Sequence, residues 1–225
     1  MATQLRELQI PTTEKAGPVS ALLLQPKAAR SLLVFGHGAG AGMRHPFMQA
    51  TADLLAAGGI ATFRYQFPFI EKGKRSPDSR ATLMETICSA VETATETAKG
   101  LPLFAGGKSM GGRITSLVAA EGRIPQVQGL VFFGFPLHAP GRPSSDRGVH
   151  LADVKVPMLF LQGTRDKLAE LDLIKPLCCH LGKRASLHIV EGGDHSFHVL
   201  KRSGRTDGEV LEELGETVGS WVSRF

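Results

Sequence analysis

Short apolar runs alternate with longer segments of helical periodicity along the chain, and this alternation limits the possible folds more than any other feature. Eight runs are predicted to be strands, at residues 5–10, 19–25, 31–35, 61–65, 103–105, 130–134, 158–162 and 185–190. Helices are predicted over 46–57, 79–99, 110–121, 167–181 and 208–224. This pattern predicts an α/β fold, a mostly parallel eight-stranded sheet with helices on both faces.

The spacing of the elements also predicts their pairing. The first two strands leave no room for a crossover helix, which needs about a dozen residues, so we expect them to be antiparallel and the others parallel. The stretches 66–78 and 135–149 have no predicted element, are rich in proline, glycine and basic residues, and follow strands. Such loops lie over the carboxyl edge of an α/β sheet, where ligands bind. We expect residues 1–225 to form one domain.

Several classes of protein do not fit the sequence. Apolar runs such as 32–35 are far shorter than the roughly 18 to 20 residues that span a bilayer. Residues 1–11 lack the pattern of a signal peptide, so we expect a cytoplasmic protein with no membrane partner. Its 26 Lys and Arg against 21 Asp and Glu include no long basic run, so no nucleic-acid partner is expected. The odd number of cysteines, three, favours reduced thiols.

The strongest local signal is the sequence GKSMGG at 107–112, between the strand at 103–105 and the helix at 110–121. This is the G-x-S-x-G pattern in the strand-turn-helix context of a nucleophilic serine. A sharp turn strains its central residue, and small residues two positions away on each side avoid clashes with it. We therefore predict that Ser109 is a nucleophile exposed at a helix N-terminus. The alternative is a glycine-rich turn that only packs closely.

A serine nucleophile needs a base and a group that orients the base. Asp166 follows the strand at 158–162, and His195 follows the last strand in a Gly-Gly-Asp-His turn. Parallel strands end at one edge, so Ser109, Asp166 and His195 are expected to converge there. Asp172 and Asp194 are alternatives for the acid, but Asp172 falls in a predicted helix and Asp194 is typical of a turn.

Acyl chemistry also needs amide donors for the oxyanion, and we predict those of Met110 and of Ala39 in the glycine-rich loop at 36–42. The alternative for this loop is phosphate or dinucleotide binding. However, it lacks the Lys-Ser/Thr of a P-loop and does not match G-x-G-x-x-G, so no cofactor is expected. No metal site is expected, because His195 and His198 are three residues apart without a convincing third ligand.

The loops at this edge also provide candidate contacts to a small-molecule substrate, namely His37, Gly38, Phe67, His138, Arg142 and His150. The segment from 64 to 80 carries Arg64, Lys72, Lys74, Arg75 and Arg80 against Glu71 and Asp78, and the second loop adds Arg147. A basic rim would concentrate anionic substrates, so we expect negative charge near the scissile bond. The alternative is that these are solvated surface charges.

With these residues assembled, the chain resembles the α/β-hydrolase superfamily over essentially its whole length, and within it the small bacterial-type, dienelactone-hydrolase-like proteins. The resemblance rests on residues 35–40, 64–69, 107–112, 135–143, 163–166 and 193–195. Dienelactone hydrolases use a cysteine nucleophile where this sequence has Ser109, so the resemblance does not imply their lactone substrate. Many relatives insert a helical cap where this chain has residues 134–156, a segment too short for a cap domain.

The sequence therefore predicts a serine hydrolase that cleaves carboxylic esters or thioesters through an acyl-enzyme. Ser109 would attack, His195 would transfer the proton, and Asp166 would orient His195. Two alternatives remain open: an interaction scaffold without useful turnover, and an acyltransferase or peptidase that uses the same residues. The sequence leaves the acyl length, the leaving group and the oligomeric state open.

Overall fold

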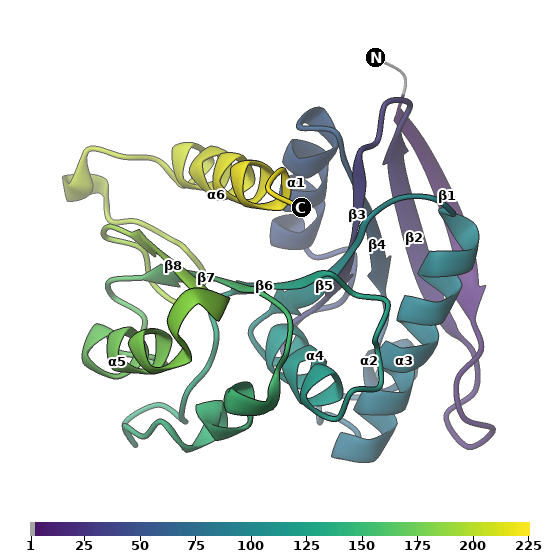
Figure 1. Ribbon diagram of the computed structural model, residues 1–225, viewed down its shortest axis with the longest axis horizontal. Helices are drawn as coiled ribbons and strands as arrows, with labels where there is room; N and C mark the ends of the chain where they lie inside the picture. Colours follow the sequence, from purple (N-terminus) through teal and green to yellow (C-terminus); the bar gives the residue numbers. More distant parts are fainter. Residues whose placement is uncertain (1–2) are drawn as a thin grey trace.

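A computed structural model describes residues 3–225, which form one eight-stranded sheet with helices on both faces (Figure 1). The strands are β1 Thr3–Ile10, β2 Val19–Pro26, β3 Ser31–Gly36, β4 Ile60–Tyr65, β5 Leu103–Lys108, β6 Gly129–Phe133, β7 Met158–Gly163 and β8 Ala185–Val190. The helices are α1 Pro46–Ala57, α2 Pro68–Glu71, α3 Arg80–Thr97, α4 Met110–Ala120, α5 Leu171–Leu181 and α6 Asp207–Val222. Short 3₁₀ helices are η1 Asp146–Asp153, η2 Gly182–Arg184 and η3 Lys201–Ser203.

The order of the strands in the sheet is β1-β2-β4-β3-β5-β6-β7-β8. β1 pairs antiparallel with β2, as the sequence predicts, and β2 pairs antiparallel with β4. Every pair from β4 to β8 is parallel. The carboxyl ends of β3 and of β5 to β8 therefore lie along one edge, and the loops after them meet there.

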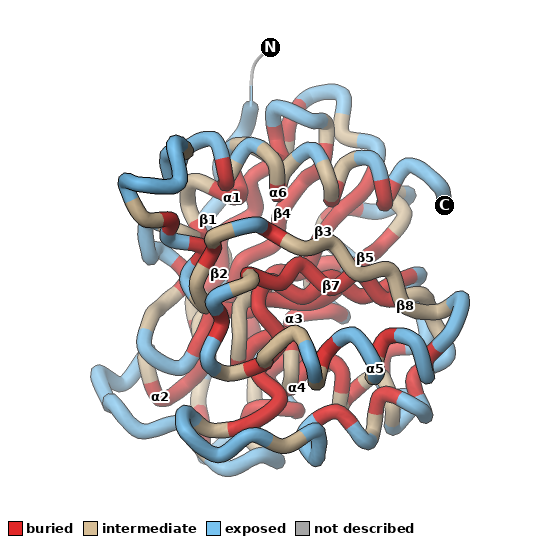
Figure 2. The backbone as a smooth tube through the Cα atoms, turned by 90° about the vertical axis from the view of Figure 1, so that its left-hand side faces the viewer, coloured by how far each residue is buried: buried red, intermediate tan, exposed pale blue. Residues whose placement is uncertain are grey.

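Two hydrophobic cores lie on opposite faces of the sheet. Helices α1 and α6 cover one face, and α3, α4 and α5 cover the other (Figure 1). Side chains alternate along β3, so that Leu32 and Val34 belong to one core while Leu33 and Phe35 belong to the other. The central strands are buried on both faces (Figure 2), which explains why they are continuous apolar runs in the sequence.

The structure differs from the expected elements in two places that bear on the site. β5 continues through Lys108, because the chain stays paired with β3 on one side and with β6 on the other. α5 begins at Leu171, four residues after the expected start. The Asp166 carboxylate accepts a hydrogen bond from the amide of Leu168, and this turn delays the helix.

The loops that had no predicted element are short and partly helical. Residues 66–78 contain the one-turn helix α2, which begins at Pro68, a position where the missing amide hydrogen is not needed. Residues 135–149 lead into η1. No separate cap domain is present in residues 3–225, and none of the helices described there is long and apolar enough to cross a membrane.

Phe132 allows a test of the core between the sheet and α4. Its ring packs against Phe135 and Phe160 at centroid distances of 5.1 and 4.9 Å, and its side chain is 0% exposed. Phe132→Ala is expected to lower the free energy of unfolding by about 3–5 kcal/mol, measured by urea denaturation. Val149→Ala, at a side chain that is 70% exposed, should change it by less than about 0.5 kcal/mol. Equal losses in the two variants would contradict this description of the core.

Candidate active site

Ser109 occupies a strained turn between β5 and α4. Its φ and ψ angles are 50° and −113°, a combination that non-glycine residues rarely adopt. The turn is this sharp because main-chain segments pack closely around it. A Cβ atom at Gly107 would lie 2.3 Å from the carbonyl oxygen of Gly36, and one at Gly111 would lie 2.4 Å from the same atom. The two glycines of the motif are therefore required by close backbone packing.

Three polar side chains from three loops form a chain of hydrogen bonds at the carboxyl edge. Ser109 Oγ lies 2.8 Å from His195 Nε2, and His195 Nδ1 lies 2.7 Å from Asp166 Oδ2. The Asp166 carboxylate accepts the Nδ1 hydrogen, which leaves Nε2 free to accept the proton of the serine hydroxyl. The structure thus brings together the three residues that the sequence predicts to converge.

Further donors hold the Asp166 carboxylate, which is 3% exposed. The side-chain amide of Gln162 donates to Oδ2, and the amide of Leu168 donates to Oδ1 at 2.8 Å. Asp194, an alternative for the acid, accepts instead from the amides of Ser196 and His198 at 2.8 and 3.0 Å. Asp194 is therefore a turn residue, as its sequence position predicts.

The two amides expected to bind an oxyanion belong to segments next to Ser109. Met110 is the first residue of α4, so its amide has no carbonyl partner within the helix. Ala39 follows Gly38, where an added Cβ would lie 3.8 Å from Ser109 Cβ. Within residues 3–225, the amide of Ala39 donates no hydrogen bond to another backbone carbonyl.

Two side chains, those of His37 and Gln66, fix the loop that carries Ala39. His37 is 0% exposed, donates from Nδ1 to the Gly38 carbonyl at 2.7 Å, and accepts at Nε2 from the amide of Phe67 at 3.0 Å. Burial lowers the pKa of His37 to about 4, so the ring is neutral at pH 7. Further along the loop, the amide of Met43 donates to Gln66 Oε1 at 2.8 Å.

A cavity of about 390 Å³ opens at Ser109. Small residues of the 38–41 loop, the apolar side chains of Phe47, Met48 and Leu168, and His195 line it. Its lining residues, Gly38, Ala39, Gly40, Ala41, His45, Phe47, Met48, Lys108, Ser109, Leu168, His195 and Ser196, include one lysine and no carboxylate.

Gly38 lines this cavity, but the other expected substrate contacts lie elsewhere. The rings of His37 and Phe67 are fully buried in the fold. His138 Nε2 contacts the Glu170 carboxylate. His150 Nε2 is hydrogen bonded to Ser116 Oγ at 2.7 Å, and Arg142 is exposed in its loop.

The expectation that Arg64 belongs to a basic rim is wrong. Its side chain is 0% exposed on β4, where Nη1 donates to the Met43 carbonyl at 3.2 Å and to Gln49 Oε1 at 2.9 Å. The sequence places Arg64 at the end of a strand, but only the fold shows that α1 covers it. Arg64 and Gln66 therefore both hold the backbone of Met43. Arg64 donates to its carbonyl, and Gln66 accepts from its amide.

Sequence reasoning missed two polar residues of the site. Gln162, the only polar residue in the apolar strand β7, could have been noticed as an unpaired polar position four residues before Asp166. Lys108 occupies the variable position directly before Ser109, and its local sequence gives no signal of the contacts described below. Among residues 3–225, no cluster of three or more His, Cys, Asp or Glu side chains is arranged to hold a metal ion.

A family model described as an alpha/beta hydrolase domain matches residues 29–223. The chain therefore belongs to the alpha/beta hydrolase family.

Solved structures have the same fold. The dienelactone hydrolase of Anabaena variabilis is 21% identical with a TM-score of 0.78, and the comparison covers 100% of this chain and 99% of that chain. A Xanthomonas campestris serine hydrolase, described as having no lid, is 19% identical with a TM-score of 0.76, over 98% of this chain and 96% of that chain. At these identities the similarity establishes the fold alone.

Curated relatives of greater length also match. Proteins from two strains of Mycobacterium tuberculosis, whose names propose a phosphoribosyl transferase, are 26% identical over 222 residues. The match covers 96% of this chain and 46% of each relative, so the chain spans about half their length.

The hydrogen-bond geometry predicts different consequences for the three candidate acids. Asp166→Asn should slow labelling of Ser109 by a neutral fluorophosphonate by on the order of 10⁴-fold, because the amide would favour the wrong imidazole tautomer. Asp172→Asn and Asp194→Asn should each slow it by less than about tenfold, because neither carboxylate contacts His195 in the structure. An Asp172 variant as slow as the Asp166 variant would show that the acid is misassigned.

Proposed function

We propose that this protein is a serine hydrolase that cleaves carboxylic ester or thioester bonds through an acyl-enzyme. The observation that carries the proposal is the hydrogen-bonded chain Ser109–His195–Asp166, at 2.8 and 2.7 Å, which opens into a cavity of about 390 Å³. Membership of the alpha/beta hydrolase family supports it. We also propose that residues 1–225 are one domain, since all eight strands pair in one sheet and α6 packs on α1.

The proposed reaction uses each group at a defined atom. Ser109 Oγ attacks the carbonyl carbon while Nε2 of His195 takes the hydroxyl proton, and the Asp166 carboxylate stabilises the resulting imidazolium. The amides of Met110 and Ala39 stabilise the oxyanion. The C–O or C–S bond then breaks, and the imidazolium gives its proton to the leaving group. A water molecule, deprotonated by His195, hydrolyses the acyl-serine and regenerates the hydroxyl.

The cavity lining supports a small substrate with negative charge. Its walls combine small residues with the apolar side chains of Phe47, Met48 and Leu168, which suit a short acyl group. Lys108 contributes positive charge to the cavity wall, and the two carboxylates near it, Asp166 and Asp194, do not line the cavity themselves. The proposed substrate class is a short acyl ester or thioester with a carboxylate near the scissile bond. Direct contacts of His138, Arg142 and His150 with substrate remain predictions.

The phosphoribosyl transferase name belongs to relatives of about twice this length, and we do not extend it to this chain. An acyltransferase or peptidase would use the same three residues, and an interaction scaffold would retain the fold without turnover. A panel of esters, thioesters and peptides, assayed with and without alcohol acceptors, separates these activities from hydrolysis.

Ser109→Ala is expected to reduce ester turnover by on the order of 10⁶-fold, because the covalent step needs the hydroxyl. Its circular dichroism spectrum should match that of the wild type, since the substitution removes one atom beside an open cavity. Cys88→Ala, at a cysteine that does not line the cavity, serves as the control and should retain full turnover. A Ser109→Ala variant with more than about a tenth of wild-type turnover would exclude Ser109 as the nucleophile.

Salt dependence tests the proposed substrate charge. At low ionic strength, kcat/KM for a carboxylate-bearing ester should exceed that for its neutral isostere by several fold, and added salt should reduce the difference. The measurement is kcat/KM for the matched pair at about 20 and 500 mM salt. Equal values at low salt would remove the anionic substrate class and leave the hydrolase proposal unaffected.

A further inference from the structure

The lysine that precedes Ser109 contacts the turn that carries His195. Lys108 Nζ donates a hydrogen bond to the main-chain carbonyl of His195. Two consecutive residues therefore hold the same histidine, Ser109 through its ring and Lys108 through its backbone. No backbone amide within residues 3–225 donates to this carbonyl, so the Lys108 side chain satisfies an acceptor that has no main-chain partner.

Aromatic rings surround the same ammonium group. Lys108 Nζ lies 5.4 Å from the ring centroid of Phe197 and 5.8 Å from that of Phe47. The two rings are stacked on each other, with centroids 5.9 Å apart and planes inclined by 13°. Aromatic faces attract a cation at such distances. Phe47 belongs to α1 and Phe197 to the turn after β8, so the lysine links β5, α1 and the histidine turn.

The turn that Lys108 contacts is strained. Phe197, two residues after His195, has a φ angle of 65°, in the left-handed region that bulky residues rarely adopt. Its side chain is 2% exposed. A strained conformation of this kind persists only where the surrounding structure holds it in place. The contacts of Phe197 with Phe47 and Lys108 provide part of that support.

Charged groups on two loops face the ammonium. Asp166, after β7, and Asp194, after β8, both favour its protonated form. His45, at the start of α1, lines the same cavity. The neighbour of the ammonium from the end of β6 is Gly134, which has no side-chain charge. Burial outweighs the two carboxylates and lowers the pKa of Lys108 to about 8.

We propose that Lys108 is a positioning residue whose ammonium group fixes the His195 turn, so that the imidazole stays within hydrogen-bond distance of Ser109. This inference rests on the proposed hydrolase function, because it assigns Lys108 a part in the same reaction. The ammonium form predominates below about pH 8 and is lost as the pH rises through that value. A neutral amine is a weaker donor and has no cation–π attraction, so the turn loosens and turnover falls.

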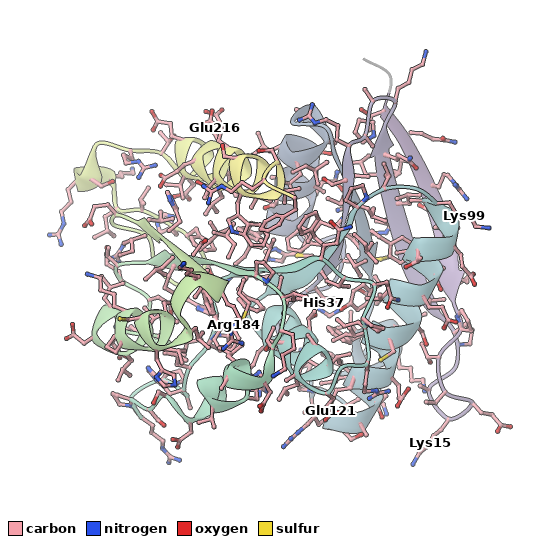
Figure 3. The ribbon with its side chains drawn as sticks, viewed as in Figure 1. Lys15, His37, Lys99, Glu121, Arg184 and Glu216 are labelled. Atoms are coloured by element: carbon pink, nitrogen blue, oxygen red, sulfur yellow. The ribbon has the colours of Figure 1, made fainter. Side chains whose placement is uncertain are left out.

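The experiment compares the wild type with Lys108→Met and Lys108→Arg on a neutral ester, so that substrate charge does not contribute. Methionine removes the charge and the donor, whereas arginine keeps both and stays protonated. Lys99→Met is the matched control, because this lysine is exposed in the turn that follows α3 (Figure 3) and does not line the cavity. For each protein, kcat, KM and the rate of labelling by a neutral fluorophosphonate are measured from pH 6 to 9.5, with thermal unfolding as the check on folding.

We expect Lys108→Met to lower kcat and the labelling rate about 10- to 100-fold at pH 7, because His195 is misplaced. KM should change by less than about twofold, because the shape of the cavity is unchanged. Wild-type kcat should fall as the pH rises through about 8. This fall should be absent in Lys108→Met and Lys108→Arg, and the arginine variant should recover much of the wild-type rate at pH 7.

Two results would overturn the role of Lys108, whatever the arginine variant does. One is a folded Lys108→Met variant with kcat within twofold of the wild type. The other is an alkaline fall in kcat that is the same in Lys108→Met and the wild type. If the wild type itself neither hydrolyses esters nor is labelled at Ser109, the proposed function fails, which is a separate outcome.

Discussion

Three main-chain segments approach one another closely beneath Ser109, and the rest of the site depends on this packing. The carbonyl of Gly36, at the end of β3, lies where a Cβ atom at Gly107 or Gly111 would be only 2.3 or 2.4 Å away. Glycine at these positions allows β5 to turn directly into α4. The turn forces Ser109 to a φ angle of 50°, and the fold holds this strain at the residue proposed as the nucleophile.

The polar groups around Ser109 are arranged before any substrate arrives. A buried carboxylate is costly unless hydrogen bonds compensate for its lost hydration, and Asp166 accepts from Gln162, Leu168 and His195. On the opposite side, the buried ring of His37 and the half-buried side chain of Gln66 hold the loop that carries Ala39. Such a site need not reorganise during the reaction, and fixed dipoles of this kind stabilise developing charge more effectively than mobile water does.

Much of this arrangement is predictable from the sequence, because it follows from local patterns and one topological rule. All eight strands are visible as short β-branched or leucine-rich runs, and the rule that parallel strands end at one edge brings Ser109, Asp166 and His195 together. Contacts between distant elements are not predictable in this way. The sequence does not show that α1 buries Arg64 or that Lys108 reaches the His195 carbonyl, since neither contact leaves a local pattern. The late start of α5 has a different, local origin, because the Asp166 carboxylate accepts from the amide of Leu168 two residues later.

Trapping the acyl-enzyme is the most direct test of the central claim. The protein is mixed with an excess of a p-nitrophenyl ester, quenched in acid within the first turnovers, digested and mapped by mass spectrometry. The account predicts a single adduct, of the mass of the acyl group, on the peptide that contains Ser109, and no adduct in the Ser109→Ala protein. Two results would contradict the account. One is an acyl group found on a cysteine, and the other is hydrolysis with no adduct on Ser109 under conditions in which breakdown of the acyl-enzyme limits turnover.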